Sequence, residues 1–226
     1  MRRLAVVFFC VVAMVAVHAG DVSSFVNLGF SPDGSRFVFG QYGSTDQDYR
    51  AYAEIFCVDV AKNSFIPGGR FTSGPAPETA AKDSRGVFAA LQNSSAPFLA
   101  KLGIDSSSQG RALYVQAEDE PKLKNIAFRD FETGSSYAVT VNTLSEGSGA
   151  EVRTAFYLVV EQTSADGKVC RRTVGLPSLM RAGVRGYLVR RIITDASGRS
   201  LVFVVEKEIA DQNGSSVRFM VETFRQ

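Results

Sequence analysis

The sequence predicts a mostly β protein of the α+β class, with antiparallel sheets packed like a sandwich. Short runs in which apolar and polar residues alternate recur along the chain, for example at Phe156, Leu158 and Val160. Turn dipeptides such as Asp166-Gly167 and Asn213-Gly214 separate these runs. An Asn-Gly between alternating runs is a strong hairpin signal. An incomplete β-propeller is the alternative architecture.

The N-terminus has the order of a secretory signal peptide. Arg2 and Arg3 precede an unbroken apolar run from Leu4 to Val17, and Val17-His18-Ala19 offers a small-x-small cleavage pattern. The run is shorter than the roughly 20 residues that cross a bilayer. We therefore expect residues 1–19 to be removed and residues 20–226 to form a single secreted β-rich domain. It would reside in the periplasm or cell envelope, with no transmembrane segment.

Composition excludes several classes of function. Removing residues 1–19 takes away two arginines and no acid, which leaves 23 basic against 23 acidic residues. A neutral chain is a poor candidate for binding nucleic acid, which needs clustered cations. The one histidine, His18, lies in the predicted signal, so the mature chain cannot form a Ser-His-Asp triad or a His-ligated zinc site. No phosphate loop, GxSxG, CxxC or GxGxxG motif is present. We expect no cofactor.

The N-terminal part predicts a hairpin, a central strand and a helical insertion. The turn Pro32-Asp33-Gly34 predicts a hairpin over Phe30–Phe39, and the run Ala53–Val60, apolar on both faces, predicts a central strand. Residues 61–77 are rich in proline and glycine and predict a loop. Alanines and leucines spaced three or four apart predict helix within 78–102, where Pro97 favours two short helices and Gly103 a stop.

The rest of the chain predicts antiparallel strands. Apolar residues there alternate with polar ones between glycine-containing turns. The predicted strands cover residues 111–117, 137–141, 156–160, 169–174, 187–193, 201–205 and 217–221.

Two resemblances support this outline. The hairpin Phe30–Phe39 resembles a blade of TolB-type propellers, but similar glycine turns recur only at Gly34, Gly110 and Gly198, farther apart than the roughly 40–45 residues of a blade. Nearly the whole mature chain resembles a family of bacterial predicted secreted proteins of unknown function. That resemblance implies no activity, cofactor or catalytic residue. The segments that carry it are Asn27-Leu28-Gly29-Phe30-Ser31-Pro32-Asp33-Gly34, Tyr52-Ala53-Glu54-Ile55, Asp59-Val60, Phe128-Arg129-Asp130-Phe131, Thr133-Gly134, Val174-Gly175-Leu176-Pro177 and Leu201-Val202-Phe203-Val204.

Two small sets of residues are candidates for a site or a covalent link. Asp46, Asp48 and Glu54 place carboxylates close together in a polar segment and are candidate ligand-binding residues. A full calcium loop needs more acids and a glycine at set spacings, so a solvated turn competes with this interpretation and we expect no metal site. Cys57 and Cys170 remain after processing. They are compatible with a disulfide and equally with two buried free thiols.

Two hypotheses for function follow. The first is a non-enzymatic binding module of the cell envelope, which holds a protein, peptide or glycan through loops on a β scaffold. The alternative is a carboxylate-dependent hydrolase acting on an envelope polymer, with Asp33, Glu54, Asp59 and Asp130 as its candidates. Two buried carboxylates about 5–10 Å apart in a cleft would favour the hydrolase.

Overall fold

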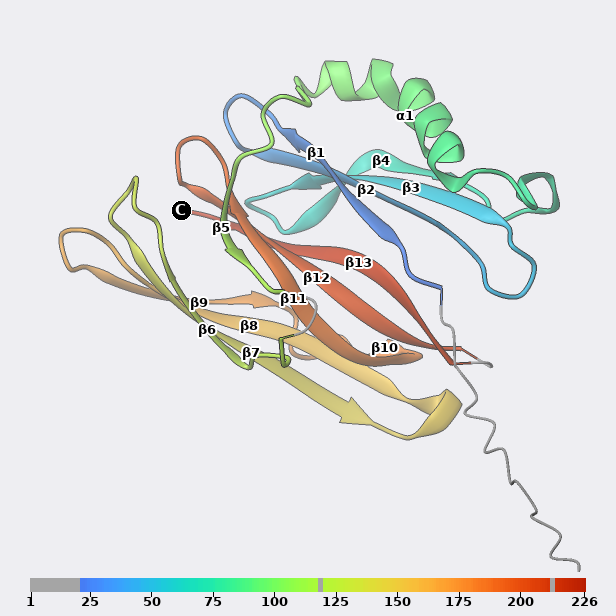
Figure 1. Cartoon of the computed structure of the whole chain (residues 1–226). Helices are drawn as coiled ribbons and strands as arrows, with labels where there is room; N and C mark the ends of the chain where they lie inside the picture. The colour runs from blue at the N-terminus through green and yellow to red at the C-terminus, as the bar shows by residue number, and fades with distance from the viewer. Residues whose placement is uncertain (1–20, 118–119, 212–213) are drawn as a thin grey trace, which may run out of the picture.

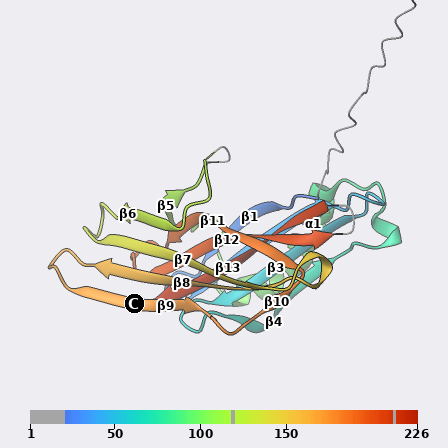
Figure 2. The ribbon, with the colours of Figure 1, turned by 90° about the horizontal axis from the view of Figure 1, so that it is seen from below.

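Three antiparallel sheets form stacked layers, with one helix on the outside (Figure 1). The computed structural model describes residues 21–117, 120–211 and 214–226, so the predicted signal peptide lies outside the described residues. We call the layers the N-terminal, central and distal sheets, in their spatial order below the helix. From below, the strands of the distal sheet lie in front of the others (Figure 2). The predicted antiparallel β class is confirmed. The described residues form no closed barrel or propeller, so the propeller alternative and the TolB-type likeness are not borne out.

The N-terminal sheet is a meander of four strands in chain order. Its predicted hairpin and its central strand β3 are confirmed. Asp33 closes the first turn because its carboxylate accepts hydrogen bonds from the Ser31 hydroxyl at 2.6 Å and the Ser35 amide at 3.0 Å. The strands are β1 (Ser24–Phe30), β2 (Arg36–Ser44), β3 (Ala51–Asp59) and β4 (Ser64–Ser73).

Strand β4 occupies most of the segment predicted to be a loop. Its pairing with β3 shifts between Phe56 and Val58, so the Pro67-Gly68-Gly69 stretch forms a bulge. Because β4 lies at the edge of the sheet, proline costs no ladder hydrogen bond there. The loop prediction was therefore wrong.

The helical insertion contains one long helix instead of two short ones. A 3₁₀ turn at Pro77–Thr79 precedes α1 (Ser84–Lys101), and Pro97 lies inside the helix. Pro97 is exposed, so the Asn93 carbonyl that loses its helical donor can be hydrated. The predicted stop at Gly103 is confirmed, since Gly103 has φ of 70° and its amide donates to the Ala100 carbonyl. No helix among the described residues is long and apolar enough to cross a bilayer.

The distal sheet is built around β8. Strand β7 pairs with one side of β8 over its whole length, while β9 and then β10 pair with the other side. The short strands β6 and β10 were not predicted, because so few residues give no readable alternation. The strands are β6 (Asn125–Arg129), β7 (Ser136–Glu146), β8 (Arg153–Thr163), β9 (Val169–Gly175) and β10 (Arg181–Ala182).

The central sheet, in the order β13-β12-β11-β5, contributes to both hydrophobic cores between the sheets. From β12, Leu201, Phe203 and Val205 pack toward the distal sheet, and Val202 and Val204 pack toward the N-terminal sheet. Burying such a side chain contributes about 1.5–3 kcal/mol. The strands are β5 (Arg111–Val115), β11 (Val184–Thr194), β12 (Ser200–Asp211) and β13 (Gly214–Arg225).

Turns from different sheets touch at one end of the stack. The Ser200 hydroxyl donates to the Gly34 carbonyl at 2.7 Å, which joins the central and N-terminal sheets. Gly34 has φ of 70°, and a Cβ at this position would lie 2.2 Å from Oδ2 of Asp195. Only glycine fits this conformation and this contact.

Replacing Gly34 should therefore cost more than replacing a glycine of the same conformation in open space. Gly167 is the matched control, because its φ is 84° and a Cβ would meet nothing within 4 Å. We expect Gly167→Ala to lower the free energy of unfolding in urea by about 1 kcal/mol, the cost of the left-handed backbone. Gly34→Ala should lose about 1–3 kcal/mol more through overpacking. Equal losses would show that the turns do not touch as described.

Candidate functional site

The predicted ligand-binding residues do not form a cluster with one another. Asp48 pairs with Arg50 at 2.7 Å in the turn between β2 and β3, where Asp46 also lies. Glu54 lies on β3, where it pairs with Arg70 at 3.1 Å. Among the described residues, no group of three His, Cys, Asp or Glu side chains could hold a metal ion. A binding role for Asp46, Asp48 and Glu54 stays a prediction.

The two cysteines belong to different sheets. Cys57 lies on β3 and packs in the core under α1, whereas Cys170 lies half-buried on β9 of the distal sheet. The central sheet separates these two sheets (Figure 1). Both cysteines are free thiols. The disulfide that the sequence left open is therefore not formed in this fold. The sequence could not exclude it, because alternation along a strand does not tell in which core a side chain lies.

The four carboxylates considered for a hydrolase lie in separate surroundings, each with a partner of its own. Asp33 closes the first turn, and Asp59 pairs with Lys62 at 3.1 Å. Glu54 accepts a hydrogen bond from Gln41 at 2.8 Å in addition to its pair with Arg70. Asp130 lies at the end of β6, in the distal sheet. The arrangement that would favour the hydrolase is not found among these four.

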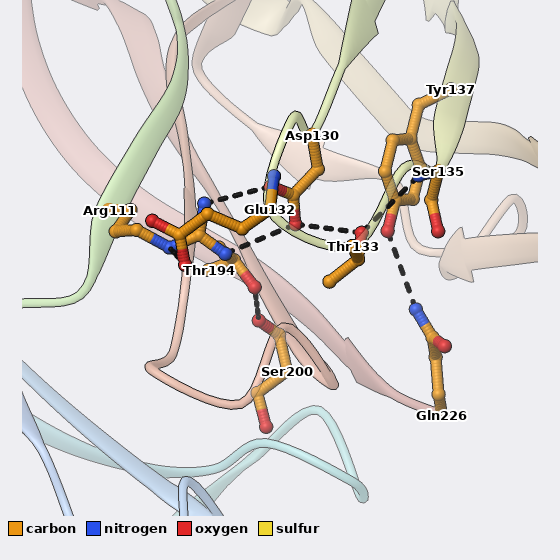
Figure 3. Close-up of polar contacts among 9 residues, drawn as sticks. All are labelled: Arg111, Asp130, Glu132, Thr133, Ser135, Tyr137, Thr194, Ser200 and Gln226. Atoms are coloured by element: carbon orange, nitrogen blue, oxygen red, sulfur yellow. Dashed lines mark hydrogen bonds and ion pairs between the residues drawn. The ribbon is translucent and has the colours of Figure 1, made fainter. Parts of the chain in front are cut away.

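Asp130 holds the distal sheet to the central sheet (Figure 3). Its side chain is 1 % exposed and accepts two hydrogen bonds from Arg111, at 2.8 and 3.1 Å. The Glu132 amide and the Thr133 hydroxyl donate two more. These contacts, that of Arg111 above all, lower the pKa of Asp130 to about 2. An ionised carboxylate with every acceptor position in use is suited to fastening two sheets, not to proton transfer.

A cleft of about 350 Å³ opens at the outer edge of β13, where the N-terminal and distal sheets flank the central one. This volume is at the lower end of the range for small-molecule sites. Three apolar side chains around it are unusually exposed: Leu176 at 59 %, Leu179 at 42 % and Phe65 at 56 %. The other lining residues are Val58, Asn63, Ser64, Arg181, Lys207, Met220, Val221 and Glu222.

Side chains of the N-terminal sheet and its turns cap the backbone of β13 along this edge. The Phe219 amide donates to Oε1 of Gln41 at 2.7 Å, and the Thr223 amide donates to Oδ1 of Asn63 at 2.8 Å. The cleft is therefore poorly suited to receiving an added strand, which would need these amides. Its lining side chains are what a ligand would meet.

Glu222 is a buried carboxylate of the cleft, 4 % exposed. It accepts a short hydrogen bond from Asn63 and pairs with Arg181, whose Nη2 lies 3.5 Å away. Burial raises its pKa, which the bonds to Asn63 and Arg181 oppose. Glu222 therefore joins residues of three sheets and orients Arg181 at the cleft.

Lys207 differs from the other charged residues of this region. Among the residues described, no salt bridge or hydrogen bond involves its ammonium group. Burial lowers its pKa, and the charge of Arg181 lowers it further, while the charge of Glu54 opposes both. A half-buried cation without a counterion is costly to keep charged, and it is a strong attractor for an anion that enters the cleft.

The free energy of unfolding at low pH should depend on the Asp130–Arg111 contact. Because the folded pKa of Asp130 lies below its ordinary value of 3.8, the contact stabilises the fold above pH 4. That contribution, about 2 kcal/mol, is lost as the pH falls toward 2. Asp130→Asn and Arg111→Met should each remove the same part of the pH dependence of the free energy of unfolding in urea. An unchanged slope between pH 5 and 2 in both variants would contradict this role.

The thiols should differ in reactivity. Burial raises the pKa of Cys57 to about 12, and the thiolate is the reactive form. In native protein lacking residues 1–19, a thiol reagent should label Cys170 first and reach Cys57 only on unfolding. Two thiols should titrate in the denatured, unreduced protein. Finding none would mean that a disulfide forms after all.

Comparison with known proteins places the chain in a family. A family model described as "Predicted secreted protein (DUF2259)" matches residues 38–225. Curated proteins and solved structures gave no match. The matched segment includes all the residues that line the cleft, and it confirms the resemblance to predicted secreted proteins. The chain therefore belongs to the DUF2259 family of predicted secreted proteins.

Proposed function

We propose that this protein is a non-enzymatic binding protein that works after export, in the periplasm or cell envelope, and holds a small ligand in the cleft at the edge of β13. The main support is that an exposed apolar rim, formed by Leu176, Leu179 and Phe65, lies in the same cleft as Lys207. Lys207 is a half-buried cation that has no ion-pair partner among the described residues. Clefts that combine apolar walls with a few convergent polar groups are the usual form of ligand sites.

The surroundings of the carboxylates also favour binding over hydrolysis. Glu222 is the one carboxylate among the described residues that line the cleft, whereas a glycosidase-type mechanism needs two that flank the bond to be cleaved. At the other end of the stack, the buried Asp195 accepts hydrogen bonds from the Ser200 amide and the Ser197 hydroxyl. Together with Asp130 it belongs to the fastening of the turns.

Nile red, an uncharged dye that fluoresces in apolar sites, tests whether the cleft is a binding site. We expect saturable binding to native protein and a loss of at least fivefold in affinity for Leu176→Asp, because a charge on the rim opposes entry of an apolar group. Leu144→Asp is the matched control, since Leu144 is 52 % exposed and lies on β7, away from the cleft. If both variants bind the dye like the native protein, the cleft is not the site.

A further inference from the structure

The charges around Lys207 are one acid short of balance. Three arginines lower the pKa of Lys207 and Glu54 opposes them, and each of the three arginines pairs with a carboxylate. Arg181 pairs with Glu222, and Arg70 pairs with Glu54. Arg218, also near Lys207, pairs with Asp21, its Nη2 lying 2.7 Å from Oδ2. Lys207 is the fourth cation. Among the described residues no salt bridge includes it, and Glu54, the one carboxylate that acts on its charge, is already paired with Arg70.

The position of Lys207 in β12 directs it to the cleft. Lys207 continues the alternate series of Leu201, Phe203 and Val205, which faces the core between the central and distal sheets. Val205 and Ile209, on either side of Lys207 in this series, both contact that core, and Lys207 lines the cleft together with Met220. The rest of a ligand whose anionic group reached Lys207 would therefore contact mostly apolar side chains.

The rest of the cleft offers little to a polar ligand. Apart from the charged groups, its polar side chains are Asn63 and Ser64, and Asn63 already bonds Glu222 and β13. Phe65, Leu176 and Leu179 give the rim an apolar surface without further donors. A glycan would leave most of its hydroxyl groups without partners here.

We infer that the cleft binds an amphiphile with one anionic head, of the medium-chain carboxylate class, whose head lies against Lys207 and whose chain lies on Leu176, Leu179 and Phe65. This inference rests on the proposed function and names the ligand class of that site. The carboxylate completes the charge balance, and the alkyl chain covers the exposed rim.

Displacement of Nile red by three ten-carbon probes tests the inference, each used below its micelle concentration. Decanoate carries the anion, decanol is neutral and decyltrimethylammonium is cationic. In native protein, decanoate should displace the dye at roughly tenfold to hundredfold lower concentration than decanol, as expected for hydrogen bonds to a charged group. The cationic probe should be the weakest. Acetate, which has the head without the chain, should not displace the dye.

Lys207→Met separates the charge from the cleft itself. Methionine keeps the apolar stem, so the variant should still bind Nile red but lose the preference for decanoate over decanol. Lys122→Met is the matched control, because Lys122 is exposed and pairs with Glu208 at 3.3 Å, outside the cleft; it should keep the preference.

Each outcome bears on one proposal or the other. If decanol displaces the dye from native protein at the same concentration as decanoate, or if Lys207→Met keeps the preference for decanoate, the ligand does not need an anionic head. The proposal of a binding cleft would still stand. If a peptide with a free terminal carboxylate displaces the dye at lower concentration than decanoate, the alkyl chain is wrong. If no probe displaces the dye and Leu176→Asp binds it like the native protein, the proposed function itself fails.

Discussion

Strand β12 has no solvent-facing side between Leu201 and Val205, and the layered structure depends on this double burial. Five consecutive apolar residues cannot be covered by one partner, because neighbours on a strand point to opposite faces. The N-terminal sheet covers one face and the distal sheet covers the other. Charged groups can then enter the stack only at its ends and edges. There a charge is costly unless it is paired, since an unpaired buried charge costs several kcal/mol.

Two places where charges enter the stack have different chemistry. At the turn end, Arg111 donates two hydrogen bonds to Asp130, and neighbouring turn groups satisfy the rest of the carboxylate. Every acceptor position is used, so the contact fastens sheets. At the edge of β13, Glu222 satisfies Arg181 but nothing described satisfies Lys207. The fully hydrogen-bonded carboxylate of Asp130 indicates a structural contact. The missing partner of Lys207 indicates a candidate site.

Much of the fold could be predicted from the sequence, because its signals are local. The turn at Pro32-Asp33-Gly34, the alternation in β8 and the apolar run of β12 each identify an element and its buried faces. The stacking order could not be predicted, since alternation shows that a face is buried but not which sheet covers it. For the same reason, the sequence left open whether Cys57 and Cys170 are bonded, while the structure places them in different sheets. Strand β4 was missed because proline and glycine also occur in edge bulges.

The candidate site was harder to predict than the fold. Its residues come from β3, the β3–β4 turn, β4, the β9–β10 connection, β10, β12 and β13, and no spacing in the sequence brings these together. One signal was nevertheless present. Lys207 follows Leu201, Phe203 and Val205 at an inward position of a series that is otherwise apolar, and a charge at such a position needs either a partner or a purpose. Asp46 and Asp48 are close in sequence, which makes them candidates for a site, yet they lie in a turn, where solvated acids are most common.

Stability alone gives no reason for a lysine at position 207. A methionine there would continue the series of Leu201, Phe203 and Val205 without burying a charge, and replacing buried charges with apolar groups is often neutral or stabilising. Arg181 is different, because removing it would leave Glu222 buried beside Asn63 alone. The fold therefore depends on one cation of the cleft and not on the other. This asymmetry is expected where one charge supports the architecture and the second is kept available for a ligand that brings its own anion.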